Sequence, residues 1–159
     1  MNYDQHINLL LQAFCGNKEA LDCALKIGKV FRIWDDVWDG DKKHEKQEFN
    51  EVFADLAFDL ERNKFFREYS REIRAMIFVA WNAWMDANEW ANAENNLKKA
   101  VAWVIRDTCN EMIFLFAWLI GGREHVRKIS PQIREAYLKE LVIGEKDNGN
   151  VLINNQAGN

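Results

Sequence analysis

The chain has 159 residues, of which 48% are hydrophobic, and a formal net charge of −4. This length suits one domain with its own buried core. The interspersed acidic and basic residues provide no basic face for a phosphate backbone, so we expect no nucleic-acid partner.

The cysteines and the apolar segments bear on the cellular setting. The three cysteines Cys15, Cys23 and Cys109 show no CxxC spacing, which argues against a disulfide framework and a zinc site. The N-terminus has no basic segment before its short apolar run, so we expect no signal peptide. The most apolar stretch, residues 112–120, is too short to span a bilayer. We therefore expect a cytoplasmic protein without a membrane span.

Apolar residues recur at three- and four-residue spacing, which predicts an all-α fold: a single-domain helical bundle of about five to six helices. The first helix should cover about residues 4–14 and stop at Gly16. The second should begin after Asn17 as its N-cap and end at Gly40. A third helix should follow over about residues 42–63, capped by Asp41.

The second half of the chain contains two longer apolar patterns, over about residues 65–90 and 93–120. Gly121 and Gly122 should stop the later helix, and the polar segment 88–96 suits either a turn or a continuation. Ser130 and Pro131 predict the start of a final helix that ends near Gly144. We thus expect a bundle domain over residues 1–143 and a polar, mobile C-terminal tail over residues 144–159.

Two helices carry acidic residues where their apolar faces predict burial. At 100° per residue, Asp35 falls inside the apolar arc of the second helix, Asp39 lies near its edge, and Asp36 faces water. Asp107 and Glu111 repeat this arrangement within the apolar stripe of the 93–120 helix. Buried like charges need a cation, a proton or a basic partner.

Paired carboxylates on facing helices suit hard divalent cations, so we expect Mg²⁺ or Mn²⁺ between them. The four acids should then open into one cavity. No histidine lies within a helical turn of either pair, which argues against a di-iron site. The alternative is that the acids pair with arginines and fix helix register in a non-enzymatic interaction protein. The candidate arginines for that pairing are Arg32, Arg74, Arg106 and Arg123.

The segment WDDVWDGD over residues 34–41, followed by basic residues, resembles the first aspartate-rich motif, DDxxD, of class I isoprenoid synthases. The resemblance implies an all-α fold in which Asp35 and Asp39 bind Mg²⁺ that holds a substrate diphosphate, with Asp36 supporting. It further implies a departing diphosphate stabilised by metal and an apolar pocket whose aromatic faces stabilise a carbocation. Candidates for supporting roles are Arg106, Trp34 and Trp38, and further aromatic candidates are Trp103 and Trp118.

A second resemblance concerns the segment DTCNEMIFLFAWLIGG over residues 107–122. It is similar to a helix of the all-α nucleotide pyrophosphatases, the dUTPase-like and MazG-like enzymes, in which an acidic pair precedes a hydrophobic run. Those enzymes use acidic pairs on neighbouring helices to hold Mg²⁺ against the phosphates of a nucleotide. Both resemblances imply a small diphosphate-bearing ligand, and we leave a homo-oligomer open.

Overall fold

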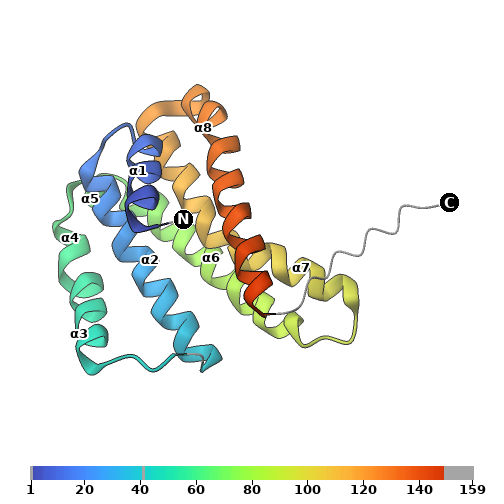
Figure 1. Cartoon of the computed structure of the whole chain (residues 1–159). Helices are drawn as coiled ribbons and strands as arrows, with labels where there is room; N and C mark the ends of the chain where they lie inside the picture. The colour runs from blue at the N-terminus through green and yellow to red at the C-terminus, as the bar shows by residue number, and fades with distance from the viewer. Residues whose placement is uncertain (1, 41, 149–159) are drawn as a thin grey trace.

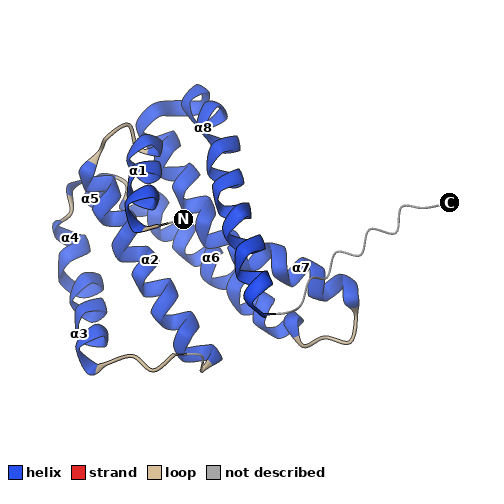
Figure 2. Ribbon diagram, viewed as in Figure 1, coloured by secondary structure: helices blue, strands red, loops and turns tan. Residues whose placement is uncertain are grey.

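The computed structural model describes residues 2–40 and 42–148, with side chains up to Leu138, and every regular element within them is helical (Figure 2). The all-α prediction is confirmed. The elements follow in the order α1 (Tyr3–Ala13), α2 (Lys18–Asp39), α3 (Lys46–Ala54), η1 (Asp55–Asp59), α4 (Leu60–Arg62), α5 (Lys64–Glu68), α6 (Ser70–Ala91), α7 (Asn96–Arg106), η2 (Asp107–Asn110) and α8 (Glu111–Asn148). No described helix is long and apolar enough to cross a membrane.

Local capping chemistry sets the bounds of α1 and α2. The Asn2 side chain and Gln5 form a reciprocal capping box at the start of α1. Asn17 caps α2 by accepting from the backbone N–H of Ala20, and Gly40 ends α2 in the left-handed conformation at φ 72°. The predicted caps of the second helix are therefore confirmed.

The third predicted helix begins later than expected and is irregular. Its N-cap is Glu45, and Asp41, the predicted cap, lies outside the described residues. A π-helical turn, η1, separates α3 from α4, where the chain accommodates one extra residue per turn. Figure 1 shows this α3–α4 segment standing along one side of α2.

The predicted 93–120 helix is broken. α6 ends at Ala91, so the polar segment around residues 92–95 is a turn, and α7 ends at Arg106. Residues 107–110 then form the tighter 3-10 turn η2 before α8 begins. Thr108 Oγ donates to the Ile105 carbonyl oxygen at 2.6 Å, a local bond that competes with regular helix.

The final helix also differs from the prediction. Gly122, at φ 72° and ψ −176°, puts a kink inside α8, which agrees with the expected stop at Gly121 and Gly122. The helix resumes directly, so Ser130 and Pro131 lie within α8 and do not start it. It also passes Gly144 and reaches Asn148. The remaining predicted tail, residues 149–159, lies outside the described residues.

The core gathers around the first half of α2. Phe116 of α8 is fully buried and packs against Phe65 of α5, with ring centroids 4.8 Å apart, and against Phe14. Burying an aromatic side chain of this kind stabilises the fold by about 1.5–3 kcal/mol. The core residues of α2 are Ala20, Cys23 and Ile27. The predicted acidic motif begins two turns beyond them, near the end of the helix, so the core holds α2 in place without enclosing the acids.

Candidate functional site

A single arginine connects the acids of α2 to two other helices. Arg106, the last residue of α7, places Nη2 at 2.7 Å from Asp39 Oδ2 and 3.3 Å from Asp35 Oδ1. The same nitrogen donates to Asn88 Oδ1 of α6 at 2.8 Å. The indole N–H of Trp84, on α6, donates to Asp35 Oδ1 at 2.7 Å. Asp35 and Asp39 therefore lie together as predicted, with a guanidinium between them.

Two donors in this cluster have no acceptor. Arg106 Nε and Asn88 Nδ2 are both buried, and neither forms a hydrogen bond within the described structure. A buried donor without a partner costs free energy, and such atoms are rare in folded proteins. The cluster thus has hydrogen-bonding capacity that the described side chains do not use.

The two acids of the second predicted pair, Asp107 and Glu111, belong to different elements and have different partners. Asp107 is the first residue of η2, and Asn110 Nδ2 donates to its Oδ1 at 3.4 Å. Burial, and then repulsion from Glu111, raises the pKa of Asp107. Glu111 instead forms a two-pronged ion pair with Arg134, at 2.9 and 3.0 Å. Asp107 has no ion pair with any described basic side chain, whereas Glu111 is neutralised.

One cavity of about 730 Å³ connects the two acidic regions. Asp35 and Asp107 both line it, but Asp39 and Glu111 are not among its described lining residues. The structure therefore brings two of the four predicted acids into one cavity, and the expected convergence of all four is wrong. Residues from α1, α2, α6, α7, η2 and α8 contribute to the walls, and the volume lies in the range of small-molecule sites.

The lining combines apolar and basic groups. Its apolar side chains are Leu10, Ala24, Leu25, Ile27, Phe31, Met112 and Ile113. Lys29, Arg32 and Arg106 supply positive charge, and the aromatic groups are Tyr3, Trp84 and Tyr137. Burial, followed by the charges of Cys109 and Asp107, raises the pKa of Tyr137 to about 12, so its hydroxyl keeps its proton at neutral pH.

The predicted supporting tryptophans lie elsewhere. Trp34, Trp38, Trp103 and Trp118 are each about half exposed (49–54%), and none is among the described lining residues. Trp38 packs edge-on against Trp84, with centroids 5.4 Å apart. Trp84 is thus the tryptophan at the cavity, and the sequence pattern gave no sign that it would bond to Asp35.

Asp36 has a separate structural role. Its Oδ2 lies 2.7 Å from His44 Nε2, and Glu48 Oε2 lies 3.0 Å from the other ring nitrogen. The His44 side chain is 2% exposed, so this pair of contacts fastens the start of α3 to the end of α2. Asp36 is not among the described lining residues, and its side chain is only 24% exposed beside His44, so the expectation that it faces water is met only in part.

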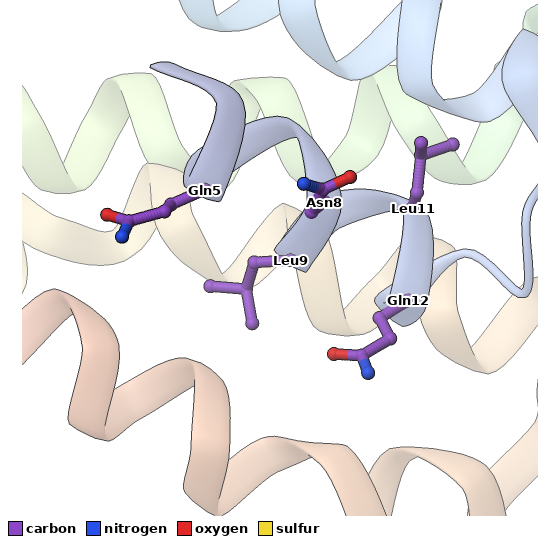
Figure 3. A pocket seen from close by; sticks show the side chains of 5 residues that line it. All are labelled: Gln5, Asn8, Leu9, Leu11 and Gln12. Carbon is purple, nitrogen blue, oxygen red and sulfur yellow. The ribbon is translucent and has the colours of Figure 1, made fainter. Parts of the chain in front are cut away.

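A second hollow, of about 630 Å³, has all its described lining residues on α1 (Figure 3). Its side chains are Gln5, Asn8, Leu9, Leu11 and Gln12. None of these five is charged or nucleophilic. The cavity at Asp35 and Asp107 is therefore the better candidate site.

The donor set fits a divalent cation only in part. No group of three or more His, Cys, Asp or Glu side chains is placed to hold a metal ion in the part of the chain that the structure describes. Asp107 fits as an oxygen ligand, because it is half-buried and forms no ion pair with a described basic side chain, and Asp35 lines the same cavity. Asp39 pairs with Arg106 through Oδ2 and is not among the described lining residues. Comparison with family models, curated proteins and solved structures found no match to this chain.

Proposed function

We propose that the cavity binds a small diphosphate-bearing molecule together with Mg²⁺, in the manner of class I isoprenoid synthases. The observation that carries the proposal is that Asp35 and Asp107, from distant parts of the chain, line one cavity with three basic side chains. Carboxylate oxygens are the ligands that Mg²⁺ prefers, and basic side chains suit the phosphate oxygens.

The residues that would hold Mg²⁺ are Asp35 and Asp107, with Mn²⁺ as a substitute. When bound, the metal would stabilise negative charge on a departing diphosphate. Among the described side chains no basic group forms an ion pair with Asp107, and its raised pKa reflects burial and then repulsion from Glu111. Arg106 offsets part of the negative charge of Asp35 and Asp39, and its side chain lines the cavity, where a guanidinium can also donate to a phosphate oxygen.

The apolar walls support a hydrocarbon body for the ligand. Leu25 and Ile27 from α2 and Met112 and Ile113 from α8 contribute nonpolar surface. Phe31 and Trp84 add aromatic faces, which stabilise positive charge electrostatically. These residues would take the role that the sequence suggested for the exposed tryptophans.

A helical interaction protein is the second candidate. Arg106 already pairs with two of the four acids and Arg134 with a third, as expected for ion pairs that fix helix register. Large apolar side chains are also exposed on several helices, which suits association with another copy or a partner. Examples are Phe53, Phe58, Phe78, Leu97 and Val104, all at least 60% exposed.

Thermal unfolding with ligands separates the candidates. We expect geranyl or farnesyl diphosphate with Mg²⁺ to raise the Tm more than dUTP with Mg²⁺, and Asp35→Asn and Asp107→Asn to reduce that effect. Asp86→Asn is the matched control, since Asp86 is exposed on α6 and does not line the cavity. Stronger protection by dUTP, or diphosphate release from it, would favour a nucleotide pyrophosphatase. Indifference to every diphosphate would favour the interaction protein.

A further inference from the structure

Gly28 leaves one wall of the cavity bare. It lies inside α2, and a Cβ built on it would meet no atom within 4 Å. Glycine inside a helix makes the helix less stable than alanine would, and Gly28 does not have the positive φ that would require glycine. The packing of the protein itself therefore gives no reason for glycine here, whereas a ligand that lies against the helix backbone would.

Arg32 lies one helical turn after Gly28 and lines the same cavity. Two other basic residues of the lining have acidic partners: Lys29 is 2.6 Å from Glu51, and Arg106 bridges Asp35 and Asp39. Arg32 forms no ion pair with any residue that the structure describes. Its charge acts on His6 across the cavity, since burial and then Arg32 lower the pKa of that imidazole.

Arg106 supplies the second guanidinium of this region. Its side chain lines the cavity, and its Nε is buried without an acceptor among the residues that the structure describes. Gly28, Arg32, Asp35 and Asp39 fall within roughly 60° of one another around α2 at 100° per residue. Arg106 contacts Asp35 from the facing helix, so the two guanidiniums border the same stretch of α2.

We infer that Gly28, Arg32 and Arg106 form an anion subsite that holds a phosphate group directly, without a metal ion. Phosphate oxygens accept charge-assisted hydrogen bonds, and the arginine fork matches their geometry. The bare backbone at Gly28 leaves room for the part of the ligand next to that phosphate. This inference rests on the proposed function for the ligand class, but it makes anchoring of the phosphate independent of Mg²⁺.

The test uses inorganic pyrophosphate as the probe, in EDTA, with the thermal unfolding of the full chain as the readout. At about 100 times its Kd, pyrophosphate should raise the Tm of the wild-type protein by roughly 5–10 °C. Arg32→Gln should lose most of this shift, and Arg32→Lys should keep part of it. Arg71→Gln, an exposed arginine of α6 outside the lining, should keep all of it.

A second variant tests the bare wall. Gly28→Leu starts from a Cβ position with no neighbour within 4 Å and extends toward the cavity that Gly28 lines, so we expect the protein to fold and geranyl diphosphate no longer to protect it. Protection that requires Mg²⁺ and survives Arg32→Gln would overturn the anion subsite while leaving the proposed function standing. Protection by pyrophosphate in EDTA that Mg²⁺ does not increase would support the subsite and count against the metal. A Tm unchanged by both diphosphates, with and without Mg²⁺, would contradict both.

Discussion

Arg106 Nη2 lies 2.7 Å from Asp39 Oδ2, joining the end of α7 to the last turn of α2 across 67 positions of sequence. The contact makes the arginine the resident counter-charge of the acidic motif. A divalent cation would have to share the carboxylates with it or displace it.

Replacing Arg106 should therefore separate its structural role from the metal hypothesis. We expect Arg106→Gln to lower the free energy of unfolding by about 1–2 kcal/mol, because partly exposed ion pairs are weak and the bond to Asn88 is also lost. The variant should gain more stability from Mg²⁺ than the wild type does, since Asp35 and Asp39 then repel each other. Chemical denaturation with and without Mg²⁺ measures both effects. Equal indifference of the two proteins to Mg²⁺ would argue that the acids serve helix register alone.

Asp107 should destabilise the folded protein at neutral pH. Its folded pKa is raised above the ordinary 3.8 by burial and by Glu111, so ionisation costs more in the folded than in the unfolded chain. Protonated Asp107 makes its full contribution to the free energy of unfolding below pH 3.8. That contribution is lost as the pH rises through the folded pKa and the carboxyl ionises. We thus expect Asp107→Asn to raise the Tm at pH 7, with a gain that disappears as pH falls toward 3.8. Melting curves across that range check the sign, and a loss of stability at pH 7 would refute it.

Gly28 should prove replaceable in the absence of ligand. Gly28→Ala meets no atom and improves helix propensity, so the free energy of unfolding should rise by about 0.5–1 kcal/mol. If the variant binds geranyl diphosphate more weakly while being more stable, stability and binding conflict at this position. Denaturant titration and calorimetric binding measure the two quantities. Destabilisation by alanine would show that the cavity wall is needed for packing.

His44 should control how firmly α3 is attached. Its two ring nitrogens lie within hydrogen-bonding distance of carboxylate oxygens from two helices, 2.7 Å from Asp36 Oδ2 and 3.0 Å from Glu48 Oε2. We expect His44→Gln to cost about 1–3 kcal/mol and to speed hydrogen exchange in residues 46–62, with little change in the core. Lys43→Gln, at the exposed neighbouring position, is the control. Unchanged exchange in that segment would mean that other contacts attach α3.

The sequence predicted those parts of the fold that depend on local chemistry. Asn17 and Gly40 bound α2 because caps act within one turn. The break at Asp107–Asn110 was missed because an apolar stripe predicts a continuous helix, while the polar side chains of the turn compete with it. Ser130 and Pro131 match the residue pattern of a helix N-terminus. The helix nevertheless continues through them, because the neighbouring Ile129 and Ile133 are buried in the core.

The site was predictable only as far as helix faces allow. The position of Asp35 on α2 predicts an inward, buried carboxylate; Asp35 does line the cavity, but its side chain is 43% exposed and is not buried. Which of four arginines would meet it depends on how α7 crosses α2, and no local pattern carries that information: Arg106 fills the role, while Arg74 pairs with Glu61 and Arg123 with Glu124. Asn88 and Trp84 were missed for the same reason.

Anomalous scattering from crystals grown with Mn²⁺ and geranyl diphosphate tests the central proposal most directly. A bound cation should give a peak in the cavity within coordination distance, about 2–2.5 Å, of Asp35 and Asp107 carboxylate oxygens. The diphosphate should lie beside it, next to Arg32 and Gly28. A cavity without an anomalous peak at saturating Mn²⁺, with Arg106 still bridging Asp35 and Asp39, would contradict the metal site.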